Sequence, residues 1–393
     1  MGLKTQSFDH RGLGYDGFMT PQPLRMGILG CAKIAHQFAR DVQSCPDVQL
    51  VAVASRDLTK AQAFAHAHGI ANVHGSYEAL LEDMDVQAVY IPLPNSLHAQ
   101  WGIEAARAGK HILCEKPLCL GVAEALSMFE QAHQNGVMLV EAYPYYFQPQ
   151  TRELLALLHQ GRIGRVQSIQ AAFGFPIQGG DSNIRMQPAL GGGALLDAGS
   201  YPMSLIRLVM GEAPESVTAQ SVWSHTGVDM ATWATLQFSG QRVAQLSCAM
   251  NTANHRHATV VGDAGAIETD YLNHTALTPT SDPRGYQPGL LRVREGTANT
   301  VPIQTIASHV GSGFAFAAEA FARVVQQEDW AGVHRAAQAS VDIAATLEAL
   351  AKSARSGHKE AVTRVRLKVR KTPGIKARAI SARASASGTG RRA

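Results

Sequence analysis

Apolar and polar residues follow two different patterns along this chain, and the change falls after residue 142. Between residues 25 and 142, short continuous apolar runs such as "MGIL" and "LVAVA" alternate with amphipathic stretches of helical period. Strands that are apolar on both faces are typical of a parallel sheet covered by helices on either side. The pattern therefore predicts a doubly wound α/β domain over residues 25–142.

After residue 143 the pattern changes to the period-two alternation of half-buried strands, with glycine-containing turns between the runs. Such alternation predicts a mainly antiparallel sheet. We expect its strands at residues 166–175, 215–224, 230–240, 242–251 and 257–271. Helical periods at about 192–210 and 312–354 complete an α+β domain, which we place at residues 143–361.

Both ends of the chain differ in composition from these two regions. Residues 1–24 are polar and contain glycine and proline, so we predict an N-terminal arm. The last thirty residues contain ten Lys or Arg and no acid, whereas the remainder holds 25 basic and 31 acidic residues. Self-repulsion and a lack of apolar side chains predict a disordered, solvated tail over residues 362–393. An arm that contacts nucleic acid is the less favoured alternative.

Composition argues against several classes of protein. No run of eighteen apolar residues is present, and the N-terminus lacks the apolar stretch of a secretory signal, so we expect a cytoplasmic protein with no membrane association. The five cysteines include no C-x-x-C pair, which argues against a disulfide framework or a zinc knuckle. The histidine pairs at 66/68 and 255/257 lack a convergent set of further ligands, so we predict no metal site.

A glycine-containing loop, "GILGCAKIA", follows the first predicted strand and opens the first helix. In this context Gly30 provides a tight turn, while Ala32 and Ala35 replace the second and third glycines of a dinucleotide fingerprint. Lys33 and Ile34 then begin a helix whose free N–H groups can bind an anion. We predict a Rossmann dinucleotide site here; taken alone, the loop also fits an ordinary strand-to-helix turn.

The end of the second predicted strand indicates which dinucleotide is bound. An acid at this position would bind the ribose hydroxyls of NAD, but the chain has Ser55 and Arg56. Arg56 suits the extra 2′-phosphate of NADP because a guanidinium forms charge-assisted, bidentate bonds with phosphate. We favour NADP(H); NAD(H) is the alternative, with Asp57 rotated into the acidic role.

Two motifs lie in "IPLPNSLHAQWGIEAARAGKHILCEKPL": they are Pro94, Asn95 and His98, and Glu115, Lys116 and Pro117. With "EAYPYYFQPQ", "GRIGRVQSIQ", "NIRMQPALGGGALLDAGSYP" and "GDAGAIE", this segment resembles the glucose-fructose oxidoreductase/inositol dehydrogenase (Gfo/Idh/MocA) family of NAD(P)-dependent oxidoreductases. The resemblance covers roughly residues 25–360. It implies a Rossmann domain followed by an α+β domain with an open-faced sheet, and cofactor contacts for both motifs.

The second motif stands at the end of a predicted buried strand, where ligands of doubly wound sheets bind. Because successive strand side chains point to opposite faces, Glu115 and Lys116 need not pair with each other. One can face the nicotinamide ribose and the other the substrate. Pro117 restricts the backbone of Lys116, through a cis bond if one is present, and so directs its long side chain.

The candidate for acid–base chemistry lies in "ALLDAGSYPMSLI", where Asp197 and Tyr201 are four residues apart and share one face of a predicted helix. Oxidation of an alcohol needs a base near the hydroxyl, and a tyrosine serves if a nearby ammonium such as Lys116 favours its phenolate. The spacing resembles the D-x-x-x-Y variant of the family, which argues against an inositol dehydrogenase. We predict that Tyr201 transfers the proton, that Lys116 positions the hydroxyl, and that Asp197 orients the substrate.

Two further residues are candidates for substrate contact. Arg185 in "NIRMQP" is placed at the rim of the pocket, with a surface ion pair as an equal alternative. Tyr145 would suit the face of a sugar or an aromatic diol, although packing against the sheet is the commoner outcome. Relatives more often have Arg-Phe-His-Pro where this chain has residues 146–149, so substrate identity does not transfer from them.

These features together predict an NADP(H)-dependent oxidoreductase that acts on a hydroxyl carbon of a sugar, at the anomeric position of an aldose, or on a cyclic trans-diol. The alternative is a non-catalytic NAD(P)-binding sensor of the same fold, whose basic tail contacts nucleic acid. The resemblance also implies a homodimer or homotetramer that forms through the sheet of the second domain.

Overall fold

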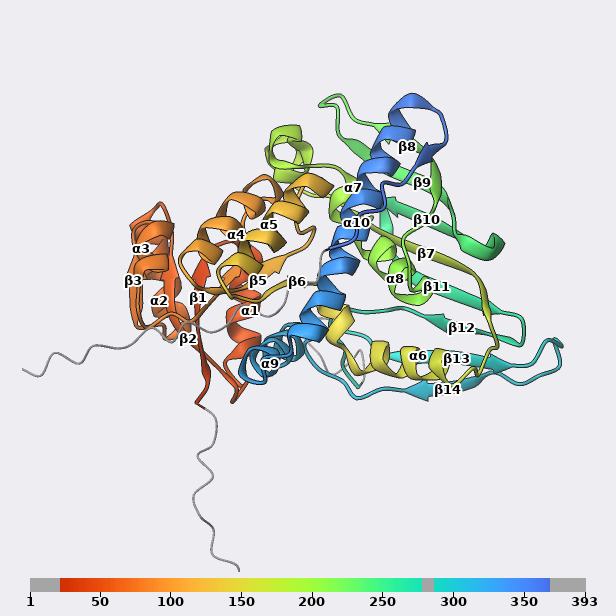
Figure 1. Ribbon diagram of the computed structural model, residues 1–393, viewed down its shortest axis with the longest axis horizontal. Helices are drawn as coiled ribbons and strands as arrows, with labels where there is room; N and C mark the ends of the chain where they lie inside the picture. Colours follow the sequence, from red (N-terminus) through yellow and green to blue (C-terminus); the bar gives the residue numbers. More distant parts are fainter. Residues whose placement is uncertain (1–21, 278–285, 368–393) are drawn as a thin grey trace, which may run out of the picture.

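The computed structural model describes residues 22–277 and 286–367 and contains one parallel and one mainly antiparallel sheet (Figure 1). Most of the predicted N-terminal arm and basic tail lie outside the described residues. The first residues of that tail are described and pack on the last helix: Val362 is buried, and the Leu367 N–H donates to Gln338 Oε1 at 2.9 Å.

The first sheet is parallel throughout, with six strands in the order β3-β2-β1-β4-β5-β6. Its strands are β1 (Leu24–Leu29), β2 (Val48–Ala54), β3 (Asn72–His74), β4 (Ala88–Ile91), β5 (His111–Glu115) and β6 (Leu139–Ala142). The strand order reverses between β1 and β4, which is where a doubly wound sheet opens a crevice for its ligand. The predicted Rossmann sheet is confirmed.

Five helices connect these strands: α1 (Lys33–Val42), α2 (Leu58–His68), α3 (Tyr77–Glu82), α4 (His98–Arg107) and α5 (Val122–Gln134). Four more belong to the second half of the chain: α6 (Pro149–His159), α8 (Ser200–Met210), α9 (Gly313–Gln326) and α10 (Trp330–Ser356), together with the short α7 (Ala194–Asp197). The apolar cluster on one face of the parallel sheet draws on α1, α2 and α9, and the cluster on the other face draws on α3, α4, α5 and α10.

The second sheet has nine strands in the order β14-β13-β12-β11-β7-β10-β9-β8-β15, of which only β7 and β10 pair in parallel. Its strands are β7 (Val166–Pro176), β8 (Ser216–Trp223), β9 (Asp229–Gln237), β10 (Val243–Ala249), β11 (Asn251–Gly262), β12 (Gly265–Thr269), β13 (Leu290–Glu295), β14 (Gln304–Ala307) and β15 (Glu360–Ala361). The mainly antiparallel sheet is therefore confirmed. The sequence pattern missed the edge strands β13, β14 and β15.

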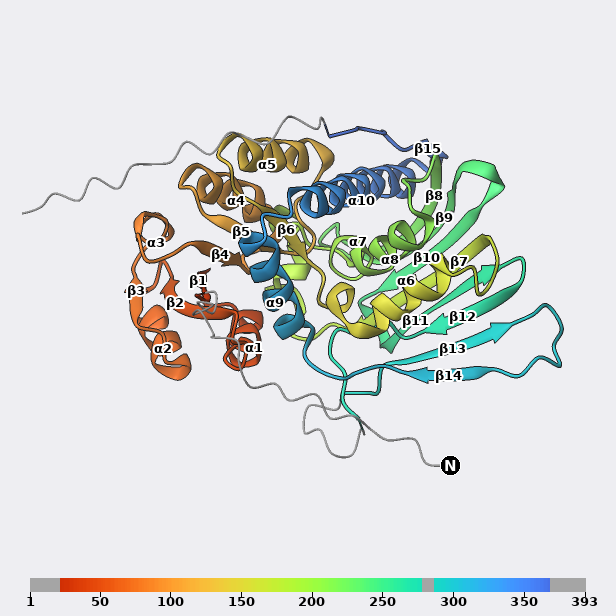
Figure 2. The same cartoon turned by 60° about the horizontal axis from the view of Figure 1, so that its bottom comes forward.

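Helices lie on one face of this sheet, as Figure 2 shows for α6, α8 and α10. The other face is open and carries exposed side chains that alternate with buried ones along each strand. Trp233 on β9 is 51% exposed and pairs in register with Gln220 on β8. Val222 on β8 is exposed on the same face.

Two predicted long helices are broken in the structure. The helix expected at 192–210 is α7 and α8, separated at Gly199, where a Cβ would lie 2.5 Å from Leu195 O and 2.9 Å from Cys248 Sγ. The helix expected at 312–354 is α9 and α10, separated near Glu328, whose φ of 52° no α-helix accommodates. α9, which precedes the second break, packs on the Rossmann sheet, so the chain returns to its first domain after building the second.

Within residues 22–277 and 286–367, no helix is both long and apolar enough to cross a bilayer.

Candidate active site

The loop between β1 and α1 has the geometry that a bound pyrophosphate needs. Gly30 has a φ of 108°, and a Cβ there would lie 2.8 Å from the Leu93 side chain. α1 begins at Lys33 after Ala32, and no side chain caps its N-terminus. The N–H groups of Lys33 and Ile34 are thus presented to an anion at the helix end. These residues fit a dinucleotide, with alanines in place of two of the usual glycines.

Three polar residues follow β2, namely Ser55, Arg56 and Asp57, and each has a different role. Asp57 caps α2, since its carboxylate accepts the Lys60 N–H at 3.2 Å. Ser55 Oγ accepts the Asp57 N–H at 3.1 Å. The carboxylate is therefore committed to the helix, while the exposed Arg56 extends beside Tyr77. With the acid engaged and the guanidinium exposed, the turn favours the 2′-phosphate of NADP. It is less suited to the ribose hydroxyls of NAD, which an acid would bind.

The motif after β4 joins separate loops together. His98 is fully buried, with Nδ1 2.9 Å from Pro117 O and Nε2 2.8 Å from Leu93 O. Asn95, which follows Pro94 in a 3-10 turn, donates Nδ2 to Gly191 O at 2.8 Å and so links the two domains. His98 is enclosed in the protein, and both ring nitrogens hold the loops at Leu93 and Pro117. The sequence motif had indicated a direct contact of His98 with the cofactor.

Glu115 and Lys116 point in different directions from the end of β5, as the alternation of strand side chains requires. Glu115 is buried and accepts a hydrogen bond from the Tyr90 hydroxyl at 2.6 Å. Burial raises the pKa of this carboxyl. The peptide bond between Lys116 and Pro117 is cis. Lys116 leaves the first domain and reaches the second.

Lys116 and Asp197 form an ion pair across the domain boundary. Lys116 Nζ lies 2.9 Å from Asp197 Oδ1 and 3.0 Å from the Asp197 carbonyl oxygen. On its other oxygen, Asp197 accepts a bond from Arg185 Nε at 2.5 Å. Although burial acts to raise the pKa of Asp197, these two cations lower it to about 2. Asp197 therefore stays ionised at neutral pH and is unsuited to carry the proton.

Tyr201 is the group beside this ion pair that can carry a proton. Lys116 Nζ lies 4.7 Å from the centre of its ring. The Tyr201 hydroxyl accepts a hydrogen bond from Asn273 Nδ2 at 3.1 Å. Although the helix is broken between Asp197 and Tyr201, the structure brings both residues and Lys116 together, as the spacing predicts.

The two candidates for substrate contact have different positions. Arg185, 38% exposed at its side chain, forms an ion pair with the site's own carboxylate, Asp197, and its contact with a substrate stays a prediction. Tyr145 is fully buried, and its hydroxyl lies 2.6 Å from Ser204 Oγ. Its ring packs at 6.2 Å from the Tyr201 ring. Tyr145 therefore supports Tyr201 from within the core, where a substrate does not reach it.

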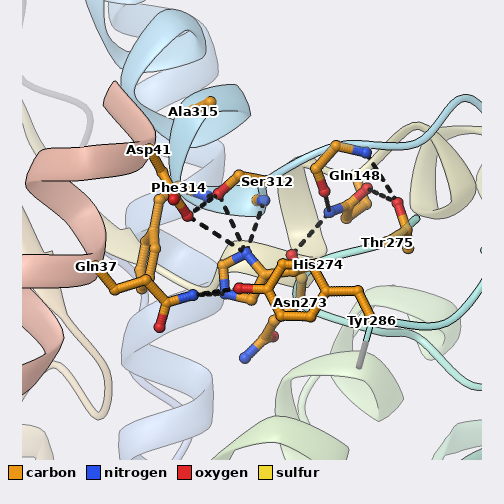
Figure 3. A network of polar contacts seen from close by, with 12 residues as sticks. Gln37, Asp41, Gln148, Asn273, His274, Thr275, Tyr286, Ser312, Phe314 and Ala315 are labelled. Atoms are coloured by element: carbon orange, nitrogen blue, oxygen red, sulfur yellow. Dashed lines mark hydrogen bonds and ion pairs between the residues drawn. The ribbon is translucent and has the colours of Figure 1, made fainter. Parts of the chain in front are cut away.

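Asn273 was missed by the sequence analysis, and a polar network holds it in place (Figure 3). Gln148 donates Nε2 to Asn273 O at 2.7 Å. The neighbouring His274 stacks on Tyr286 at 5.0 Å between ring centres, and Gln37 from α1 donates to the Tyr286 hydroxyl at 2.6 Å. Helix α1 of the Rossmann domain is thus tied to the loop that binds Tyr201.

A second tie between the domains uses the start of α9. Ser312, the N-cap of α9, donates to Asp41 Oδ2 on α1 at 2.5 Å, and its Oγ lies 3.2 Å from His274 Nδ1. No motif could have indicated the contact between Ser312 and Asp41, because the two residues are 271 positions apart in sequence. In the part of the chain that the structure describes, no group of three or more His, Cys, Asp or Glu has the placement of a metal site.

Two family models match the chain. The oxidoreductase family with an NAD-binding Rossmann fold covers residues 24–143, and the GFO/IDH/MocA C-terminal domain covers residues 151–268. The chain belongs to the GFO/IDH/MocA family. This confirms the resemblance that the two sequence motifs indicated.

Several members of the GFO/IDH/MocA family are similar over most of their length. The NADP(+)-dependent D-xylose 1-dehydrogenase 2 of Haloferax volcanii is 33% identical over 335 residues, which are 85% of this chain and 98% of that protein. The trans-1,2-dihydrobenzene-1,2-diol dehydrogenase of Danio rerio is 39% identical over 62% of this chain and 74% of its own length. A crystal structure of a 3-ketoreductase from Actinomadura kijaniata with NADP and TDP-benzene has a TM-score of 0.75 at 31% identity, covering 84% of this chain and 98% of that one.

Proposed function

We propose that this protein is an NADP(H)-dependent oxidoreductase that interconverts a hydroxyl and a carbonyl group on a sugar or a cyclic trans-diol. The observation that carries the proposal is the meeting of Lys116, Asp197 and Tyr201 at the carboxyl edge of the parallel sheet. The nicotinamide, when bound, accepts or donates the hydride. The remaining tasks of holding the hydroxyl and moving its proton fall to these side chains.

Each of the three side chains has a separate role in the proposal. Lys116 stays charged because Asp197 raises its pKa against the effect of burial, so its N–H groups can hold the substrate oxygen. Tyr201 takes the hydroxyl proton in oxidation and returns it in reduction. Asp197, fixed by two cations, keeps Lys116 in position and accepts hydrogen bonds from neighbouring substrate hydroxyls.

A polyhydroxylated ring suits this site best. Lys116, Asp197 and Arg185 bring charged donors and acceptors together, and such groups bind vicinal hydroxyls well. The similar proteins are named for D-xylose, a dihydrobenzenediol and a keto sugar, all of which carry adjacent oxygen substituents on a ring. We therefore propose an aldose, oxidised at the anomeric carbon, as the first substrate to test.

NADP is the proposed cofactor because of the turn after β2. Asp57 is used as the cap of α2, and Arg56 is exposed beside it. A guanidinium without a competing acid is the arrangement that a 2′-phosphate requires.

We also propose that the open face of the second sheet forms a homodimer or homotetramer interface. The support is the exposed Trp233, with Val222 close by on the neighbouring strand, on a face that no helix of the described chain covers. Exposed apolar groups in such a patch are typical of an interface between copies.

The proton role of Tyr201 is tested by Tyr201→Phe. We expect NADP+ reduction with a panel of aldoses and trans-diols to fall by about 10²–10⁴-fold, because the proton acceptor is lost, while NADPH binding followed by fluorescence is unchanged. Tyr143→Phe is the matched control, since it removes a buried hydroxyl from a ring 5.6 Å away. A native protein that binds NADPH tightly but turns over no member of the panel would instead favour the sensor.

The choice of cofactor is tested by Arg56→Glu. Replacing the phosphate-binding cation by an acid should lower kcat/KM for NADP+ by roughly 10–100-fold and leave or improve that for NAD+. Arg40→Glu, an equal change of charge on the exposed last turn of α1, is the control. Unchanged discrimination between the two cofactors in Arg56→Glu would rule out this residue as the selector.

The assembly is tested by Trp233→Glu, which places a charge on the open face. Light scattering after gel filtration should report a multiple of the 42.0 kDa chain for the native protein and a smaller assembly for the variant. Met84→Glu changes a residue that is 85% exposed on the Rossmann domain and should leave the assembly intact. The same mass for both variants would argue for a different interface.

A further inference from the structure

A guanidinium with two buried nitrogens lies against the Tyr201 ring. It belongs to Arg256 on β11, and its central carbon is 4.4 Å from the centre of that ring. Three more aromatic rings surround it: those of Tyr271 at 4.5 Å, Phe173 at 4.9 Å and Tyr145 at 5.5 Å. Cations are attracted to aromatic faces at such distances, and more strongly where water is excluded.

The charge of Arg256 is not neutralised by a carboxylate. Its Nε and Nη2 are buried and have no hydrogen-bond partner within the described residues, and no acid of that part of the chain forms an ion pair with it. Burial lowers the pKa of Arg256, yet a guanidinium remains protonated in proteins. A half-buried cation with no carboxylate partner is costly, so its presence beside the site calls for a compensating role.

The groups around Arg256 differ in whether they can become negative. Tyr271 donates its hydroxyl proton to Ala172 O, and the Tyr145 hydroxyl pairs with Ser204. Burial raises the pKa of both phenols. The Tyr201 hydroxyl, by contrast, accepts a bond from Asn273, an arrangement that suits a phenolate oxygen. Tyr201 is therefore the ring in this group that is arranged to lose its proton.

We propose that Arg256 is a positioning residue for the reaction, which acts with Lys116 to stabilise the phenolate of Tyr201. The inference rests on the proposed function. Two cations then lie near the same ring, Lys116 at 4.7 Å from the first domain and Arg256 at 4.4 Å from the second. Lys116 is shared with Asp197, whereas Arg256 has no carboxylate partner in the described chain, so its full charge acts on the aromatic group.

Other charged and titratable groups face Tyr201 as well. From the first domain they are Lys116, Tyr90 and the Glu115 carboxylate bonded to Tyr90; from the second they are Asp197, Arg185, Tyr143, Tyr145 and Tyr271. Asp197 is negative and already paired with two cations. Removal of Arg256 therefore leaves Lys116 and Arg185 as the cations that favour the phenolate, and both of them are paired with Asp197.

The test compares pH profiles of kcat/KM for NADP+ reduction in the native enzyme, Arg256→Met and Arg256→Lys, with D-xylose and trans-1,2-cyclohexanediol as probes. Loss of the cation makes the phenolate harder to form, so the rising limb should move to higher pH by about one unit in Arg256→Met, with about tenfold lower rate on that limb. KM for NADP+ should not change. Arg256→Lys should restore most of the native profile.

A readout without substrate accompanies this test. The near-ultraviolet absorbance of tyrosinate, recorded for each variant with and without the Tyr201→Phe change, isolates the titration of this one phenol. It should shift to higher pH in Arg256→Met and return in Arg256→Lys. Arg294→Met, which removes a half-buried Arg from β13 of the same sheet, should leave titration and profile unchanged.

The outcomes separate this inference from the proposed function. A rate that falls equally at all pH values, with an unmoved limb and an unmoved tyrosinate titration, would overturn the role of Arg256 and leave that of Tyr201 intact. Full activity in Tyr201→Phe would instead remove the proton role of Tyr201, and a native protein that binds NADPH but turns over no substrate would remove the proposed function itself. If Arg256→Met does not fold, as thermal unfolding would reveal, Arg256→Gln takes its place with the same expected shift.

Discussion

The ion pair between Lys116 and Asp197 is the constraint on which this molecule is organised. It joins Lys116, the first residue after β5, to Asp197 at the end of α7 in the other domain, and both side chains are nearly excluded from water. A charge excluded from water is tolerated only when its partner is present. Removing one member of the pair leaves the other as a buried charge whose lost hydration is not compensated. The two domains must therefore keep one relative position for the site to persist.

Several independent contacts secure that position. Asn95 bonds to Gly191 on one side of the crevice, and Ser312 bonds to Asp41 on the other. α10, which is 27 residues long, contributes to the apolar clusters of both sheets (Figure 2). Because α9 also packs on the Rossmann sheet, the second domain is held to the first through the core as well as through polar contacts.

The sequence predicted the parts of the site that local patterns can encode. Two such patterns can be recognised without a structure. One is a strand followed by Glu115-Lys116-Pro117, and the other is the four-residue spacing between Asp197 and Tyr201. The placement of His98 was harder to predict. A motif indicates that a residue is functionally important, but a residue of a motif can either contact a ligand or support the loop that contacts it. His98 does the second, with both ring nitrogens against carbonyl oxygens.

Arg256 and Asn273 lay beyond sequence reasoning for a different reason. Arg256 reaches Tyr201 only because β11 pairs with β7, which sets Arg256 opposite Phe173. A shift of that register by one residue would turn its side chain to the other face. The break between α9 and α10 was missed in a similar way, since it depends on the positive φ of Glu328 and not on a Gly or Pro that a reader of the sequence would notice.

The most direct test of the account is a crystal structure of the protein with NADP+ bound. The account predicts that the nicotinamide ring lies at the carboxyl edge of the parallel sheet with Lys116 Nζ and the Tyr201 hydroxyl both facing the space next to its reactive carbon. A nicotinamide bound elsewhere, or a Tyr201 hydroxyl that points away from it, would contradict the central claim that the two domains meet to form one catalytic centre.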